Sequence, residues 1–268
     1  MSSGTIEDLP PPTELPASPA PVPNEGKPLS GRLALVTGAS RGIGAAVAVE
    51  LSRLGARCVL VARTQGGLEE TDDAIRQLGG ESATLLPFDL AKGAERIDAI
   101  GPSIYERFGR LDILVHAAGS LGTLTPVAHI TPRDWDEVIG VNLTATWRLI
   151  RTCDPVLRAS DAGRAVLLTT GRVPQPKAYW GAYGATKAGM EHLALTWAQE
   201  AATTALRVNL LDPGAVATRM RATAYPGENP ESINQPAEVA GEIASLCLPG
   251  VVRNGEVVRI QRRGAAPV

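Results

Sequence analysis

Short apolar runs and longer amphipathic stretches alternate along most of the chain. The apolar runs, each of strand length, lie at residues 32–37, 57–62, 82–89, 111–117, 164–170, 206–212 and 256–261. The stretches between them have helical character and lie at residues 45–54, 66–79, 94–108, 132–159, 178–202 and 236–248. Apolar strands separated by amphipathic helices predict an α/β fold in which a doubly wound parallel sheet carries helices on both faces.

Residues 1–29 do not follow this pattern. They contain eight prolines, and four acids against one Lys. Such a segment has too little apolar surface to offset the entropy lost on folding, so we expect a disordered, proline-rich tail at 1–29 and a single folded domain at 30–268. The tail is either a dispensable extension or a polyproline segment that a partner protein recognises.

Charge and cysteine usage narrow the classes of function. The net charge is -2, and because the tail alone carries -3, the domain is left at +1 with no basic stripe, which argues against nucleic-acid binding. Cys58, Cys153 and Cys247 lack metal-ligand spacing, so we expect no metal site, no disulfide and a cytoplasmic location. No apolar run reaches the roughly 18 to 20 residues that span a bilayer, which argues against a membrane protein.

A glycine-rich loop follows the first predicted strand. Its sequence is Gly38-Ala-Ser-Arg-Gly-Ile-Gly44, and a helical stretch comes directly after it. Glycines let a phosphate approach the backbone, and a helix N-terminus offers unpaired N–H groups. A strand, such a loop and a helix in this order predict dinucleotide binding and a Rossmann-like three-layer α/β/α domain, although the spacing G-x-x-x-G-x-G departs from the commoner G-x-G-x-x-G.

Other polar or small residues also follow predicted strands. Ligands of such sheets bind beyond the carboxyl ends of the strands. The residues expected at that edge are Asp89, His116 to Gly119, Thr170, and Asp212 to Gly214.

Tyr183 and Lys187 are four residues apart in a predicted helix, so their side chains point to the same side. An ammonium close to a phenol favours the phenolate and lowers its pKa from about 10. We therefore expect Tyr183 to donate and accept protons near neutral pH. The alternative is a partly buried aromatic residue with a solvated lysine one turn away.

The chain from about residue 31 to 264 resembles the classical short-chain dehydrogenase/reductase family. The matching motifs occur in order: Thr37 to Gly44, Asp89-Leu90, Leu111 to Gly119, Val141-Asn-Leu143, Tyr183-x-x-x-Lys187 and Pro213 to Thr218. Three further segments resemble a bacterial subgroup of oxidoreductases, a likeness that supplies no substrate: Trp180 to Tyr183, Arg207 to Asn209 and Thr218 to Ala222.

The resemblance implies a set of catalytic roles. Tyr183 would be the general acid that protonates a carbonyl oxygen, or the base in the reverse oxidation. Lys187 would hold the nicotinamide-ribose hydroxyls and lower the pKa of the phenol. Asn142 would hold a water of a proton relay, and Thr170 would bond the substrate oxygen.

Two positions depart from the family pattern. Thr170 replaces the usual Ser, and its extra methyl group restricts χ1, so we expect a narrower or shifted substrate range. His116-Ala-Ala-Gly119 replaces Asn-Asn-Ala-Gly. His116 is then either a hydrogen-bonded structural imidazole or a catalytic group.

The charge of the residues that follow the second predicted strand indicates which dinucleotide the chain binds. An NAD enzyme commonly has an acid after that strand, whereas this chain has Arg63, and it has Arg41 in the glycine loop. Two cations suit a 2'-phosphate, so we expect NADP, with NAD as the second candidate. The expected cofactor-binding residues are Gly38, Ser40, Arg41, Gly42, Ile43, Gly44, Arg63, Asp89, Leu90, Ala117, Ala118, Gly119, Tyr183, Lys187, Pro213, Gly214, Val216 and Thr218.

A small carbonyl or alcohol compound is the expected substrate. Its pocket should be lined by Ser120, Leu121, Arg172, Val173, Trp180, Ala215 and a loop at about 218–235, in which residues 226–230 form a turn of a lid. Arg172 either pairs with an anionic substrate group or is a surface cation. The resemblance also suggests a homodimer or homotetramer formed through the stretches 132–159 and 178–202. The competing hypothesis is a dinucleotide-binding sensor or scaffold that has lost turnover.

Overall fold

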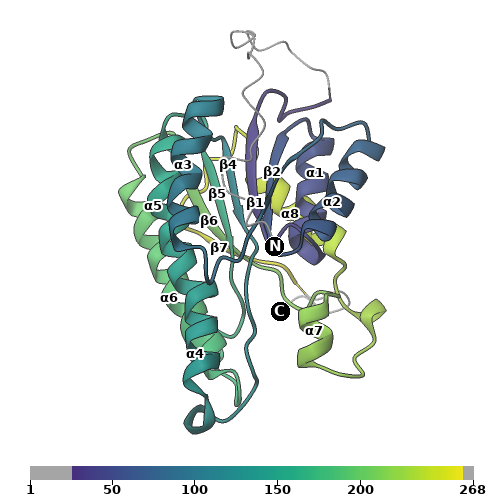
Figure 1. Cartoon of the computed structure of the whole chain (residues 1–268), viewed down its shortest axis with the longest axis vertical. Coiled ribbons are helices and arrows are strands. Elements are labelled where there is room, and N and C mark those ends of the chain that lie inside the picture. Colours follow the sequence, from purple (N-terminus) through teal and green to yellow (C-terminus); the bar gives the residue numbers. More distant parts are fainter. Residues whose placement is uncertain (1–25, 262–268) are drawn as a thin grey trace, which may run out of the picture.

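The computed structural model describes residues 26–261, which form a seven-stranded parallel sheet covered by helices on both faces (Figure 1). The strand order is β3-β2-β1-β4-β5-β6-β7, and every neighbouring pair is parallel. The strands are β1 (Leu33–Thr37), β2 (Arg57–Ala62), β3 (Thr84–Pro87), β4 (Ile113–His116), β5 (Arg164–Leu168), β6 (Arg207–Asp212) and β7 (Val257–Arg259). The predicted doubly wound α/β fold is confirmed.

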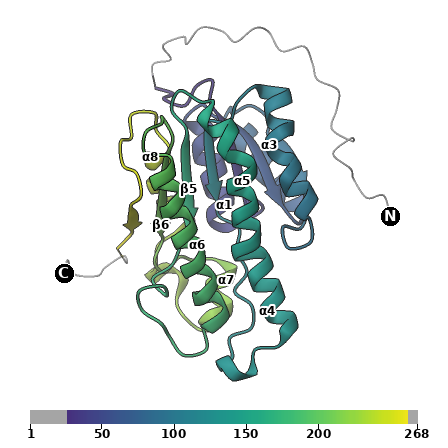
Figure 2. The same cartoon turned by 90° about the vertical axis from the view of Figure 1, so that its left-hand side faces the viewer.

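Two helical layers sandwich the sheet. One face carries α1 (Gly42–Arg53), α2 (Gln65–Gln77) and α8 (Pro236–Leu246), and the other carries α3 (Ala94–Phe108), α5 (Ala145–Arg158) and α6 (Gly181–Glu200) (Figures 1 and 2). Two shorter helices, α4 (Pro132–Ile139) and α7 (Arg219–Ala224), extend beyond the carboxyl ends of the strands (Figure 1).

Successive side chains of the buried strands point alternately to the two faces of the sheet, and they form two separate hydrophobic cores. In β1, Leu33 and Leu35 join the cluster beneath α3, α5 and α6, whereas Ala34 and Val36 join the cluster beneath α1, α2 and α8. Successive side chains of a strand point to opposite faces, so a strand covered on both faces is apolar throughout. This arrangement holds the sheet rigidly beneath its loops.

The predicted helical stretch at 132–159 is continuous in the structure from residue 132 to 158, but it is not a single regular α-helix. The structure divides it into α4, a π-helical segment (Gly140–Thr144) and α5. Asn142 lies in the π-helical segment, and its amide bonds to Ser120 and Thr186. A π-helical turn accommodates one extra residue, which re-aims a side chain without interrupting the apolar periodicity that predicted one helix.

Most other predicted boundaries agree within a few residues. β3, for example, is shorter than the predicted run at 82–89, because apolar residues continue past the last paired position. Residues 1–25 of the predicted tail lie outside the described residues. Leu29 is fully buried, and its N–H donates to the Leu54 carbonyl oxygen (2.9 Å), so the folded domain already includes this residue. Within 26–261, no helix is long and apolar enough to cross a membrane.

Candidate active site

The carboxyl ends of the strands open into a cavity of about 780 Å³. All the predicted cofactor-binding residues line it, as do Tyr183, Lys187 and Thr170, whereas Asn142 lies behind the wall. Of the predicted substrate-pocket residues, Ser120, Arg172, Trp180 and Ala215 line it, and Leu121 and Val173 do not. Segments far apart in sequence therefore converge at the expected edge.

The glycine loop forms a cradle with little room for side chains. Gly38 has a φ of 68°, and a Cβ there would lie 2.8 Å from the Ala118 nitrogen. A Cβ at Gly44 would lie 2.3 Å from the Gly38 carbonyl oxygen. Helix α1 begins at Gly42 without a side-chain cap, so its first N–H groups and its positive dipole end face the cavity. These residues fit the phosphates of a dinucleotide.

His116, at the end of β4, is a buried link between two parts of the site. Thr146 Oγ1 donates to the Asn142 carbonyl oxygen (2.8 Å), so it accepts from the ring Nε2–H of His116 (2.9 Å). The ring Nδ1 consequently accepts from Thr37 Oγ1 (2.8 Å), which itself accepts from the Ala118 N–H (3.3 Å). Burial lowers the pKa of His116 to about 3. Of the two alternatives for His116, the hydrogen-bonded structural imidazole is the one observed.

Tyr183 lies near the start of α6 and is only 9% exposed. Burial raises the pKa of its phenol to about 12, a hydrogen bond with Thr170 lowers it in part, and the nearby charge of Asp212 raises it further. Removal from water dominates this shift, and the lowering of the phenol pKa by Lys187 together with an oxidised nicotinamide stays a prediction for the cofactor-bound protein. The phenol therefore holds its proton at neutral pH.

Lys187 is buried one turn further along α6. Its Nζ donates to the Leu168 carbonyl oxygen (2.7 Å) at the end of β5 and approaches Met190 Sδ (3.6 Å). Burial lowers the pKa of this ammonium to about 8, and the charge of Glu191 opposes the shift. The ammonium is thus held by a carbonyl oxygen at the carboxyl edge of the sheet.

Asn142 is fully buried and bonded through its whole amide. Its Oδ1 accepts from the Ser120 N–H (2.7 Å), and its Nδ2 donates to the Ser120 carbonyl oxygen (2.8 Å) and to Thr186 Oγ1 (3.1 Å). A Cβ built on Gly119 would lie 3.4 Å from Asn142 Oδ1 and 3.8 Å from Lys187 Nζ. Asn142 thereby connects the loop after β4 to the helix that carries Tyr183 and Lys187.

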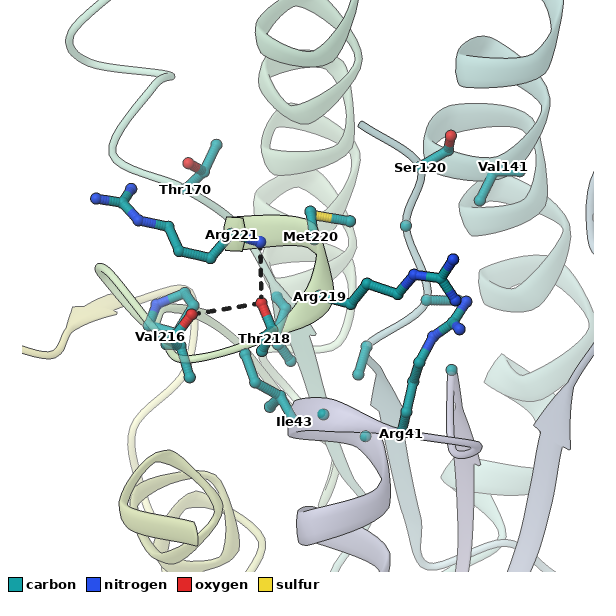
Figure 3. A pocket seen from close by; sticks show the side chains of 18 of the residues that line it. Arg41, Ile43, Ser120, Val141, Thr170, Val216, Thr218, Arg219, Met220 and Arg221 are labelled. Carbon is teal, nitrogen blue, oxygen red and sulfur yellow. Dashed lines mark hydrogen bonds between the residues drawn. The ribbon is translucent and has the colours of Figure 1, made fainter. Parts of the chain in front are cut away.

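Positive charge gathers at the dinucleotide end of the cavity. Arg41 and Arg63 line it as predicted, and Arg219 of α7 adds a third guanidinium that sequence reasoning missed. Figure 3 shows the side chains of Arg41 and Arg219 extending toward each other from opposite walls. The same view shows Met220 on the short helix α7, whose first turn is capped by Thr218 Oγ1 accepting from the Arg221 N–H (3.2 Å). In the sequence, the predicted lid loop at about 218–235 was the one indication that residues beyond Thr218 cover the site.

Comparison with known proteins places this geometry among reductases and dehydrogenases. The family model described as short chain dehydrogenase matches residues 32–229. The uncharacterized oxidoreductase YciK of Escherichia coli is 35% identical over 212 residues, covering 79% of this chain and 84% of that protein. A short chain dehydrogenase structure from Pseudomonas syringae has a TM-score of 0.83 at 35% identity, covering 88% and 97% of the two chains. Another, from Escherichia coli CFT073 and complexed with NADPH, has a TM-score of 0.83 at 33% identity, covering 87% and 98%.

Proposed function

The chain belongs to the short-chain dehydrogenase family, and from this membership and the site geometry we propose that it interconverts a carbonyl and a secondary alcohol by hydride transfer. One observation carries the proposal: the Tyr183 phenol and the Thr170 hydroxyl open into the same cavity as the glycine cradle. A proton donor and a dinucleotide site in one cavity are the parts that this chemistry needs.

The bound nicotinamide would supply or receive the hydride. Tyr183 would give its proton to the carbonyl oxygen during reduction, and Thr170 would donate a second hydrogen bond to that oxygen. Because the pKa of Tyr183 is raised to about 12, the phenol is in the acid form that reduction requires at neutral pH. For oxidation, the positive charge of the oxidised nicotinamide and the ammonium of Lys187 would favour the phenolate.

Lys187 and Asn142 would support the proton donor. Lys187 would hold the nicotinamide-ribose hydroxyls with the N–H groups not engaged by Leu168. Asn142 would hold the relay water on the path from Lys187 to solvent. The side-chain amide of Asn142 is bonded to Ser120 and Thr186. These bonds support a fixed position of the main chain next to the proposed water path.

NADP is the proposed cofactor, with NAD as the weaker candidate. No acid follows β2 at Arg63-Thr64, and Arg41 supplies a second cation. The related structure complexed with NADPH supports the same choice. At roughly 1.5 to 3 kcal/mol per charged hydrogen bond, the 2'-phosphate should strengthen binding at least tenfold. We expect wild type to bind NADPH more tightly than NADH and Arg63→Asp to reverse or abolish the difference. Equal affinities in wild type would contradict the assignment.

A substrate screen tests the activity itself. Oxidation of NADPH would be followed with ketones, aldehydes and 3-oxoacyl thioesters, and Tyr183→Phe would serve as the matched control because it removes one hydroxyl. We expect turnover of at least one carbonyl by wild type and a loss of about 10²- to 10⁴-fold in the variant. Tight NADPH binding without turnover of any carbonyl would instead favour the sensor or scaffold hypothesis.

We also propose a homodimer or homotetramer in the cytoplasm. The family membership suggests assembly through α4, α5 and α6. Trp147, which is 44% exposed on α5, is a large apolar side chain that such an interface would cover. The three cysteines are unpaired and buried, as suits a reducing compartment.

A further inference from the structure

The substrate end of the cavity has an aromatic wall beyond Tyr183. The ring of Trp180 meets that of Tyr183 edge to face at 5.7 Å and lies 5.9 Å from the ring of Tyr225, which follows α7. All three side chains line the cavity. The residue before Trp180 has a left-handed backbone (Tyr179, φ 75°), a strained conformation that persists where the surroundings impose it. The wall is therefore a fixed feature that suits a planar molecule.

Three cations surround Tyr225 at this wall. Lys177 Nζ donates to the phenol oxygen (2.9 Å), and the guanidinium carbon of Arg221 lies 3.7 Å from the ring centre. Although burial alone would raise the pKa of Tyr225, the hydrogen bond from Lys177 and the charges of Lys177, Arg221 and Arg172 lower it. Positive potential is thus concentrated where the aromatic wall meets the cavity opening.

Only one of these cations is neutralised by the lid. Glu228 accepts from Arg221 through both carboxylate oxygens (2.6 and 2.7 Å). Within residues 26–261, no carboxylate lies within 4 Å of the Arg172 guanidinium or of Lys177 Nζ. Asp212 lies at the inner end of the cavity, where its charge acts on Tyr183 and its carboxylate accepts from the Gly214 N–H (3.1 Å). The outer end therefore keeps an excess of positive charge.

We propose that this end of the cavity binds a planar carbonyl compound that carries an oxyanion group, with its planar body against Trp180 and its anion at the Arg172 guanidinium, beside Tyr225 and the Lys177 ammonium that binds its phenol. The guanidinium of Arg172 offers paired N–H donors that match a carboxylate or phosphate, and Lys177 adds a point charge. The inference rests on the proposed carbonyl chemistry for the reacting end only. Of the two alternatives for Arg172, it takes the pairing with an anionic substrate group.

Two probes of the same shape and different charge test the proposal. The affinities of 4-acetylbenzoate and 4-acetylbenzamide for the full chain saturated with NADP⁺ would be measured by calorimetry. The part of the tryptophan fluorescence quenching that is lost in Trp180→Phe would serve as a second readout. We expect the acid to bind at least about tenfold more tightly than the amide, since one charged hydrogen bond supplies that factor. Arg172→Gln should remove most of this preference. Arg133→Gln, which removes an exposed arginine of α4 outside the cavity lining, should leave it unchanged.

The outcomes separate this inference from the proposed activity. Equal affinity for the two probes, binding of neither, or a preference that survives in Arg172→Gln would overturn the anion site. A charge preference without reduction of any carbonyl would support the anion site and contradict the proposed activity. Turnover of acid and amide with equal kcat/KM would support the activity and overturn the anion site.

Discussion

At the scale of single residues, burial controls the chemistry of the site. It raises the pKa of Tyr183 and lowers those of Lys187 and His116. At pH 7 Tyr183 and His116 are therefore neutral, whereas Lys187, with a pKa of about 8, is still mostly an ammonium. The positions of Tyr183 and Lys187 could be predicted from their spacing on one helix. Their protonation could not, because it depends on the depth of the cavity and on the approach of Asp212, which belongs to a strand end 25 or more residues away in the chain.

The lowered pKa of Lys187 predicts a specific pH dependence of stability. Its pKa is about 8 in the folded chain and has an ordinary value of 10.5, so between these values the unfolded chain binds more protons. Lys187 therefore contributes a rise in stability with pH from about 8 toward 10, of at most about 3 kcal/mol. Two kinds of group act in the opposite direction, because the unfolded chain loses their protons first. They are the thiols of Cys58, Cys153 and Cys247 near and above pH 9, since burial raises their pKa values to about 12, and Tyr183 above pH 10.

Urea denaturation between pH 7.5 and 9.5 would measure this effect. Lys187→Met should be more stable than wild type at pH 7.5, because it removes a buried ammonium, and this advantage should shrink as the pH rises to 9.5. The exposed Lys92 provides the control substitution Lys92→Met, whose stability relative to wild type should not change with pH. A difference between Lys187→Met and wild type that stays constant from pH 7.5 to 9.5 would show that Lys187 is not the source of the effect.

At the scale of elements, the lid (residues 218–235) completes the cavity. Its base is closed by the bridge between Val216 and Asn234, and its short helix α7 is held by the ion pair of Arg221 and Glu228. The sequence indicated a loop with a turn at this place. It could not indicate that Arg219 and Met220 reach the cavity, because a six-residue helix has too few turns for a periodic signal, and its orientation is set by tertiary contacts.

Loss of the lid ion pair should loosen this element alone. Both side chains are partly buried (24% and 19% exposed), so Glu228→Gln leaves Arg221 without its carboxylate and should cost about 1 kcal/mol locally. Hydrogen exchange of the amides in 218–235 should then quicken several-fold, while that of β1 and β4 stays unchanged. Glu50→Gln, which breaks a similar pair with Arg53 on the surface of α1, should leave exchange in the lid unchanged. Equal exchange of the lid amides in wild type and Glu228→Gln would contradict this role.

At the scale of the whole molecule, the order of strands explains why distant motifs meet. β1 and β4 are neighbours at the point where the sheet reverses its winding, so the glycine loop and the loop after His116 lie side by side along one wall of the cavity. The alternation of apolar runs was enough to predict this architecture. The π-helical segment at Asn142 was not predictable, because it carries no periodic signal of its own and the bonds of Asn142 to Ser120 and Thr186 form only in the folded chain.

The transfer of a label from cofactor to product tests the central claim most directly. NADPH carrying deuterium on the transferring carbon would be mixed with the active carbonyl compounds of the screen, and the alcohols would be analysed by mass spectrometry. We predict deuterium on the former carbonyl carbon with wild type, and a transfer about 10²- to 10⁴-fold slower with Tyr183→Phe at unchanged cofactor affinity. Tight NADPH binding with no label in any alcohol, or transfer at the wild-type rate by Tyr183→Phe, would contradict the account.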